Sequence, residues 1–295
     1  MGENMFKKED ISDSYYAHGF LKKEDLGDPE KIVKKGHVEM LGKQLEVVDM
    51  TYPLHERMPI YPSGGPHPVI VVQGKHAKEL VHGHLFTIHM HMGTHTDAPI
   101  HVEAGYPTID VMPLDKYIGK GVIVSIPKKK WEKIMPEDLE KATPKIEKGD
   151  IVIINSGWHR YYGDNITYFC HAPGLYKEAA EWFVAKGVKA VGVDQPAMDH
   201  PLGTRLVQTL DGSFPPFAPW LIKEYERETK SDVYKDFPYW EPSHRILYTH
   251  GIPGCENVGG DIDKATGKRC TIAMIPLNIL RGDASLVRVV AMLER

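Results

Sequence analysis

The sequence has little of what marks disulfide-stapled, secreted or membrane proteins. Its only cysteines, Cys170, Cys255 and Cys270, are odd in number and widely spaced, which excludes a disulfide framework and favours a reducing compartment. No stretch approaches the roughly 18 apolar residues of a membrane-spanning helix. The first residues, MGENMFKKED, lack the apolar core of a signal peptide. We therefore expect a cytoplasmic protein without a membrane partner.

An excess of charge is also missing. The 295 residues carry 36 basic and 40 acidic side chains, for a net charge of −4 and a pI near 6.5. This balance gives no electrostatic reason to expect nucleic acid as a partner. The chain contains no G-x-S-x-G elbow, so a serine hydrolase of that type is not supported. Hydrophobic content of 42% is ordinary for a globular protein.

Alternating short strands and helices predict an α/β protein. Apolar or β-branched runs indicate strands at 46–51, 69–73, 121–126, 149–155, 190–194, 271–276 and 286–292. Helices are expected at 136–142 and at 175–186, where Gly187 provides a C-terminal cap. Residues 245–248 fit either a strand or a short helix. The strand, helix and strand between 149 and 194 indicate a crossover unit with parallel strands.

We divide the chain into an N-terminal helical arm, residues 1–44, and one domain, residues 45–295. The arm is polar and charged, and either embraces a partner subunit or forms a frayed tail. Residues 206–243 are rich in proline and aromatic side chains. An irregular excursion of this length is usually a lid, a binding loop or an oligomer contact.

The most informative stretch is residues 87–101, TIHMHMGTHTDAPIH, which holds four histidines and one aspartate. In an extended chain, His91, His95 and Asp97 would share one face, and the methionines the other. A helix would turn Asp97 away, and Gly93 and Pro99 disfavour it. We therefore expect a strand, or a strand followed by a loop.

Imidazole nitrogen and carboxylate oxygen are the ligands that Zn²⁺ and similar borderline divalent ions take. His91, His95 and Asp97 would supply three of them from one short segment, and Asp97 could bridge two ions. Any one histidine alone would more often be an ordinary core or surface residue. So many imidazoles packed together without an ion would leave polar groups unpaired or repelling one another, so the set predicts a metal site.

Residues 91–101, HMGTHTDAPIH, match the pattern HxGTHxDxPxH, which resembles the signature of the metal-dependent cyclase-like hydrolases. This family includes bacterial kynurenine formamidases, isatin hydrolases and trans-dienelactone hydrolases. The likeness extends from about residue 46 to the C-terminus through VVDMTYPLHERMPIYP, GDIVIINSGW, AVGVDQP and HRILYTHGIPGCEN. It implies an α/β fold whose central mixed β-sheet is partly closed into a barrel-like layer with peripheral helices, a swivelling β/β/α-like arrangement.

By matching position, the resemblance implies that His91, His95 and Asp97 bind a first metal ion. A second ion would be completed by His244 and Glu256, which have the twelve-residue spacing of the binuclear members. Isatin hydrolase-like members work with one ion, so the family implies one or two ions per chain, Mn or Zn. Homodimers or homotetramers are usual for such proteins. The segment DQPAMDHPLGT resembles the isatin hydrolase side more than the formamidases.

The resemblance assigns proton transfer to His101. It lies four residues beyond Asp97 and could deprotonate a metal-activated water and then protonate the leaving group. Such general acid–base catalysis typically accelerates a reaction by about 10²–10⁴-fold. The predicted activity is hydrolysis of a small amide, cyclic amide (isatin-like) or lactone, an enzyme acting on C–N bonds other than peptide bonds. Kynurenine formamidase proper is the first alternative. Five residues are candidate substrate contacts, although each alone is more often ordinary core: Trp158, Phe214, Phe217, Trp220 and His200.

Two readings of another class remain. Gly83, His89 and His91 have the spacing at the start of a cupin metal motif, which would suit an iron-dependent dioxygenase. A cupin would then need a glutamate near position 95, where this chain has His95. The remaining option is a non-catalytic metal-binding module. It would be favoured had Asp97 or His101 been replaced, and neither is.

Overall fold

The computed structural model describes residues 38–40, 42–62, 65–75, 78, 81–209 and 215–294. Nearly all of the expected N-terminal helical arm lies outside these ranges. Its described end is a strand, β1 (Val38–Met40), which pairs antiparallel with β2 (Lys43–Asp49). The arm therefore ends in a hairpin that belongs to the main sheet, rather than in a helix. Across the described ranges, none of the helices is long and apolar enough to cross a membrane.

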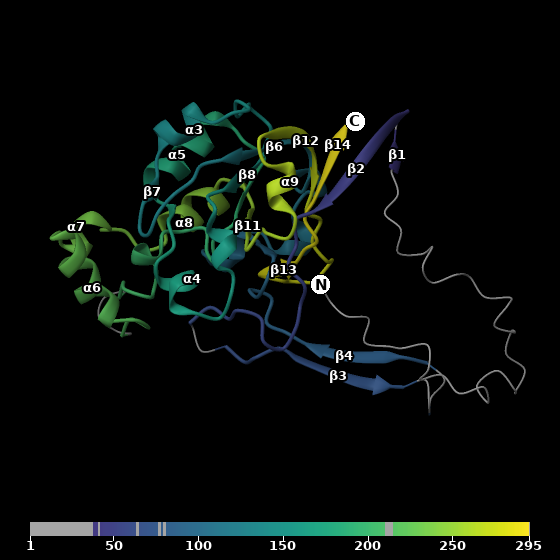
Figure 1. Ribbon diagram of the computed structural model, residues 1–295, viewed down its shortest axis with the longest axis horizontal. Coiled ribbons are helices and arrows are strands. Elements are labelled where there is room, and N and C mark those ends of the chain that lie inside the picture. Colours follow the sequence, from purple (N-terminus) through teal and green to yellow (C-terminus); the bar gives the residue numbers. More distant parts are fainter. Residues whose placement is uncertain are drawn as a thin grey trace, which may run out of the picture.

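One large mixed sheet organises the protein and curls into a half-barrel, as the expected fold class requires (Figure 1). Its ten strands run in the order β1, β2, β14 (Val290–Glu294), β12 (Lys268–Ala273), β6 (Ile118–Ser125), β8 (Ile151–Asn155), β10 (Ala190–Val193), β11 (Gly254–Glu256), β5 (His95–Asp97) and β13 (Ala284–Leu286). The four strands β6, β8, β10 and β11 are mutually parallel, and the flanking pairs are antiparallel.

The centre of the sheet confirms the predicted crossover unit. Strand β8 is followed by helix α5 (Lys177–Lys186) and then by β10, which pairs parallel with β8. Helix α5 ends at Gly187, whose φ of 70° is the left-handed conformation that glycine adopts without a steric penalty. Because β8 and β10 are buried on both faces, their sequences are continuous runs of apolar residues.

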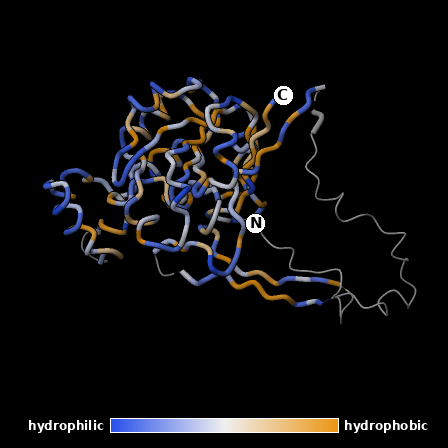
Figure 2. The backbone as a smooth tube through the Cα atoms, viewed as in Figure 1, coloured by the Kyte–Doolittle hydropathy of each residue, from blue (hydrophilic) through white to orange (hydrophobic). Residues whose placement is uncertain are grey.

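The two faces of the sheet carry separate hydrophobic cores. Alternate residues of the central strands face helices α3 (Pro136–Lys141), α5 and α8 (Pro242–Thr249) on one side. The other residues pack against α9 (Ile262–Ala265) and the loops that follow β5. Apolar segments accordingly concentrate inside the layered body (Figure 2). Of the two options for 245–248, the structure has the helix.

A third core lies beside the sheet, under the expected excursion. Its aromatic side chains come from α4 (Ile166–Cys170), α6 (Trp220–Thr229), α7 (Val233–Asp236) and the loops between them. The acidic and basic residues expected to form a helix within 206–243 do so in α6, and α7 is a second helix in this stretch. Two small sheets complete the fold: β3 (Val69–Gly74) with β4 (Gly83–Thr87), and β7 (Lys133–Ile134) with β9 (Gly174–Leu175).

The single strand expected at residues 286–292 is wrong. Residues 286–292 contribute to two strands, β13 and β14, which lie at different places in the sheet. Strand β13 pairs with β5, and β14 pairs with β2 and β12. The chain changes partners around Arg288, whose guanidinium binds Asp49 at 2.6 Å. Both halves are apolar, so the hydrophobic pattern alone gave no sign of the break.

Candidate metal centre and its pocket

The histidine segment is only briefly a strand. Residues between β4 and β5 form a turn, in which Gly93 takes a φ of 60°. Strand β5 covers three residues, and a 3₁₀ turn at Pro99–His101 follows. His95 and Asp97 share a face of β5 as predicted, but His91 reaches them through the turn rather than along a strand. With this φ, and with the flexible end of Met58 only 2.6 Å from where a Cβ would lie, the turn favours glycine.

Strand register places the first group of polar side chains. In the antiparallel pair of β5 and β11, His95 lies directly opposite Glu256. The Nε2 atom of His95 is 3.4 Å from Oε2 of Glu256 and 3.5 Å from Oδ1 of Asp97. All three side chains are buried. One imidazole nitrogen and two carboxylate oxygens therefore face one another inside the protein, within 4.8 Å.

Hydrogen bonding around this group is incomplete. The Nδ1–H of His95 donates to the carbonyl of Gly93 at 2.8 Å, so a neutral His95 points its Nε2 lone pair at the two carboxylates. His95 Nε2 is buried without a hydrogen-bond partner among the described residues, and the equally buried Asp97 Oδ1 has a close ion-pair contact with His91 at 2.9 Å. A lone pair facing carboxylate oxygens is repulsive, and unpaired buried polar atoms are costly. A divalent cation placed among these atoms would satisfy all of them.

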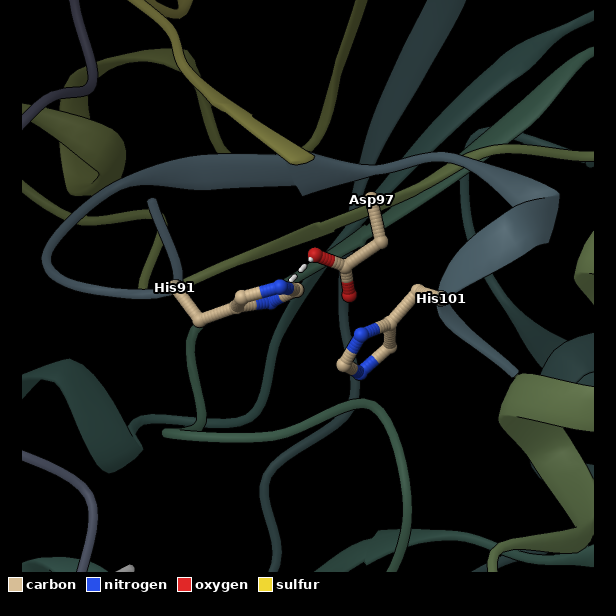
Figure 3. Close-up of side chains that lie close together, drawn as sticks. All are labelled: His91, Asp97 and His101. Carbon is tan, nitrogen blue, oxygen red and sulfur yellow. Dashed lines mark ion pairs between the residues drawn. The ribbon is translucent and has the colours of Figure 1, made fainter. Parts of the chain in front are cut away.

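A second group shares Asp97 and lies on the open side. Figure 3 shows the His91 ring against Asp97, with the His101 ring beside both. His91 Nδ1 is 2.9 Å from Asp97 Oδ1, and its Nε2 is 3.0 Å from Oδ2 of Asp283. Burial lowers the pKa of His91, but Asp97 and Asp283 outweigh it and raise this pKa to about 10. The centroids of the His91 and His101 rings are 4.1 Å apart.

His244 joins the two groups from helix α8. Its Nε2 lies 3.0 Å from Oε1 of Glu256 and 3.8 Å from Oδ2 of Asp97. Its Nδ1 is 2.6 Å from Oδ2 of Asp199, which also accepts the His244 backbone N–H. Asp199 is fully buried and fixes the orientation of the ring, as carboxylates do behind metal-bound histidines.

Asp97 is the centre of the whole arrangement. Its Oδ2 accepts a hydrogen bond from the Tyr248 hydroxyl at 3.0 Å, and its Oδ1 faces the imidazoles. Burial alone would raise the pKa of Asp97, but His91, His95 and His101 hold it well below the usual range. A carboxylate surrounded by imidazoles is the electrostatic environment of a metal ligand that bridges two positions.

The structure therefore brings together all six residues that the sequence assigned to chemistry: His91, His95, Asp97, His101, His244 and Glu256. It adds three supporting side chains that the sequence analysis missed. Asp199 stands in a segment singled out for its neighbour His200, and Tyr248 stands in the HRILYTHG stretch. Asp283 carries no local signal, because only the pairing of β13 with β5 brings it to His91.

A cavity of about 460 Å³ opens over this cluster. Its floor includes His91, Asp97, His101, His244 and Glu256. Its other walls come from the loop after β2, with Ile60 and Tyr61, and from the segment between 196 and 245. The wall residues of that segment are Pro196, Ala197, Thr204, Arg205, Phe217, Trp240, Glu241 and Arg245. The volume suits a small organic molecule.

Of the five expected substrate contacts, Phe217 lines this cavity. Trp158 is core, with its indole N–H donating to the carbonyl of Tyr168 at 3.0 Å. His200 is fully buried and stacks on Phe237 with ring centroids 4.3 Å apart. Trp220 stands at the exposed start of α6, away from the cavity lining. Phe214 lies outside the described residues.

Comparison with known proteins agrees with this geometry. The family model described as "Putative cyclase" matches residues 48–200, about half of the chain, including the whole histidine segment. The chain belongs to the cyclase family. The cupin alternative is thereby excluded, in agreement with the parallel strands at the centre of the sheet.

This cyclase-family chain has relatives that are named as hydrolases. It is 25% identical over 249 residues to "Kynurenine formamidase" of Bacillus cereus (strain ATCC 10987 / NRS 248), covering 84% of this chain and 98% of the relative. Its fold matches isatin hydrolase A from Labrenzia aggregata with a TM-score of 0.65 at 19% identity, over 85% and 94% of the two chains. A structure described as a potential metal-dependent hydrolase with cyclase activity matches with a TM-score of 0.60 at 20% identity, over 84% and 98%.

Proposed function

We propose that this protein is a metal-dependent hydrolase of a small amide, cyclic amide or lactone. His91, His95 and Asp97 would hold one divalent ion, Mn or Zn. His244 and Glu256, with Asp97 as a bridge, would hold a second. The observation that carries the proposal is the buried His95 Nε2, which faces Asp97 and Glu256 at 3.4–3.5 Å and has no hydrogen-bond partner among the described residues.

The residues present fit such an ion. The donors are imidazole nitrogens and carboxylate oxygens, the set that Zn²⁺ and Mn²⁺ share. The histidine orientations are fixed from behind by Gly93, Asp283 and Asp199. Such outer hydrogen bonds typically contribute 10- to 100-fold in metal affinity or activity. When bound, a divalent ion supplies Lewis-acid polarisation of a carbonyl and lowers the pKa of water.

His101 is suited to move the proton. Its ring lies beside His91 and Asp97 on the cavity floor, and no ion pair joins it to a carboxylate of the described residues. Desolvation by the surrounding protein lowers the pKa of His101. The nearby Asp97 opposes this shift, and His91 and His244 add to it. A neutral imidazole can take a proton from the attacking water and return it to the leaving nitrogen or oxygen.

Two substrate types are favoured by particular observations. The curated relative supports an N-formyl arylamine such as N-formylkynurenine, and the fold neighbour supports isatin, a cyclic amide. The aromatic rings of Phe217, Trp240 and Tyr61 in the cavity wall suit either of these flat molecules.

The deciding experiment measures metal content and turnover together. Purified protein is analysed for bound metals, and hydrolysis of isatin, N-formylkynurenine and a dienelactone is followed before and after chelation. We expect about one or two equivalents of Mn or Zn and turnover of one compound that chelation abolishes and added metal restores. Failure to bind any divalent ion under any loading condition would contradict the proposal at its root.

The number of ions has its own test. Glu256→Ala removes a carboxylate that contacts both His95 and His244. With two ions, this variant should lose about one equivalent of metal and most of its activity. Unchanged metal content and activity in Glu256→Ala would show that the second position does not exist in this protein.

A further inference from the structure

Glu241 has an unusual backbone for an acidic residue. It occupies the N-cap position of helix α8 with φ 43° and ψ 50°, in the left-handed region. This region is strained for a residue with a Cβ, and such strain persists only where surrounding structure enforces it. The Glu241 N–H donates to the carbonyl of Gly203 at 2.7 Å, and Pro242 follows at the first helical position.

The usual task of an acidic residue at this position is taken by another side chain. An N-cap carboxylate normally accepts the first backbone N–H groups of its helix. In α8, the N–H groups of Ser243 and His244 donate to Asp199 instead, at 2.7 and 2.9 Å. The Glu241 side chain makes no capping hydrogen bond. Its strained backbone is therefore not explained by helix capping.

The Glu241 carboxyl belongs to the cavity over the metal cluster. Glu241 lines this cavity together with Tyr61, His244 and Arg245, and its charge acts on the Tyr61 hydroxyl across the cavity. Among the described residues, no hydrogen bond or ion pair joins the Glu241 carboxylate to a partner, and the neighbouring Arg245 guanidinium binds Glu103 at 3.1 Å. Burial, with Asp199 and Glu256 nearby, raises the pKa of Glu241 to about 7.

We propose that Glu241 accepts a hydrogen bond from the N–H of the substrate and thereby selects amides with an N–H over lactones and N-alkylated amides. The inference rests on the proposed hydrolase function and narrows its substrate class. A half-buried acceptor in the cavity, without a hydrogen-bond partner among the described residues, favours a ligand that supplies a donor. A ligand without a donor leaves this acceptor unpaired.

The chemistry of amide cleavage gives this contact a second effect. The scissile nitrogen must gain a proton before it leaves, and we assign that proton to His101. A hydrogen bond from the substrate N–H to Glu241 leaves the nitrogen lone pair open to His101. It also strengthens as positive charge develops on the nitrogen, so it stabilises the transition state more than the bound substrate.

The test compares three matched compounds: a lactam, its N-methyl derivative and the lactone with the same ring. Binding is measured by calorimetry and hydrolysis by kcat/KM, in the wild type, Glu241→Gln and Glu241→Gly. The control is Glu103→Gln, which removes the carboxylate on the other side of Arg245. Glu103 does not line the cavity.

In the wild type we expect kcat/KM for the lactam to exceed that for the N-methyl lactam by about 10- to 100-fold, the range of a hydrogen bond to a charged group. Glu241→Gly should remove this preference, and Glu241→Gln should reduce it. Glu103→Gln should preserve it. Glycine adopts positive φ without strain, so Glu241→Gly should melt at or above the wild-type temperature, which separates lost selectivity from misfolding.

The outcomes separate this inference from the proposed function. Equal preference in the wild type and Glu241→Gly, with hydrolysis intact, would overturn the role of Glu241 alone. Selective binding of the lactam without any hydrolysis would support Glu241 and contradict the hydrolase. If none of the three compounds is bound or hydrolysed, both the role of Glu241 and the proposed hydrolase function are contradicted.

Discussion

The floor and the outer wall of the cavity are built on different physical principles. The centre of the floor consists of strand ends whose hydrogen-bond register fixes Asp97 and Glu256, since His95 lies opposite Glu256. His91 and His101 join them from turns, and His244 joins them from helix α8. The outer wall, residues 196–245, has no strand among its described residues and rests on helices and an aromatic core. His95 Nε2 at the floor is buried without a hydrogen-bond partner among the described residues, whereas the wall is stabilised by burial of aromatic rings.

This difference separates chemistry from selectivity. In the floor, a change of one ligand leaves a charged or polar group buried and unpaired, so the whole cluster depends on each member. In the wall, a changed side chain alters the shape of the cavity but leaves the sheet intact. We therefore expect substitutions in the floor to abolish activity and substitutions in the wall to change which compound is used.

The largest effect should come from Asp97→Asn, which removes the carboxylate charge shared by both groups of the cluster. Metal binding should be lost together with activity. Asp283→Asn is the matched control, because Asp283 supports His91 from behind. There we expect a loss of about 10- to 100-fold in metal affinity. Metal titration of both variants measures the contrast, and an Asp97→Asn variant that still binds metal tightly would refute the bridge.

His101→Ala should lower kcat by about 10²–10⁴ while leaving metal content unchanged, because His101 moves a proton and binds no ion in our assignment. Turnover and metal analysis of the same preparation measure both. An activity within about tenfold of the wild type would show that proton transfer is done elsewhere. Loss of metal in this variant would make His101 a ligand, consistent with its place beside His91 and Asp97.

The same contrast decides how much could be read from the sequence. The floor was predictable because residues 91–101 carry four chemical side chains in one segment, and a residue pair near the C-terminus repeats the family spacing. The segment itself was harder, since alternation suggested a long strand where the structure has a turn at Gly93 and only three strand residues. The local residue pattern does not show over how many residues a strand pairs with its neighbour in the sheet.

The wall could not be predicted in the same way. Aromatic residues mark both a substrate cavity and a hydrophobic core, and composition does not distinguish them. Trp158 and His200 are core, whereas Phe217 and Glu241 face the cavity. Glu241 gave no signal at all, because its role depends on Asp199 capping helix α8 from another part of the chain.

Protonation of His200, which is buried in the aromatic core beneath the outer wall, should destabilise the protein in acid. Burial lowers the pKa of His200 to about 3, so the folded protein keeps it neutral while the unfolded chain takes up a proton near pH 6.5. Its contribution to the free energy of unfolding is complete above pH 6.5 and is lost as pH falls toward 3.

A variant isolates this contribution. His200→Asn keeps an acceptor for the Leu202 N–H and removes the titrating group. The free energy of unfolding should therefore fall by about a few kcal/mol less between pH 6.5 and 4 than it does in the wild type. Urea unfolding at several pH values measures it, with His250→Asn as the exposed-histidine control. An unchanged slope in His200→Asn would show that another group dominates.

The smallest effect should separate two aromatic residues of the excursion. Phe217 lines the cavity, with the Arg205 guanidinium 4.6 Å from its ring centroid, whereas Trp220, three residues later, does not reach the cavity. Phe217→Ala should raise KM about 5- to 30-fold through about 1–2 kcal/mol of lost apolar contact, with kcat changing less. Trp220→Ala should leave both constants near wild type. Because both rings are similarly exposed, 37% and 43%, exposure alone would predict equal effects. If the two variants do behave alike, the outer wall does not contact the substrate, and selectivity must be set in the floor.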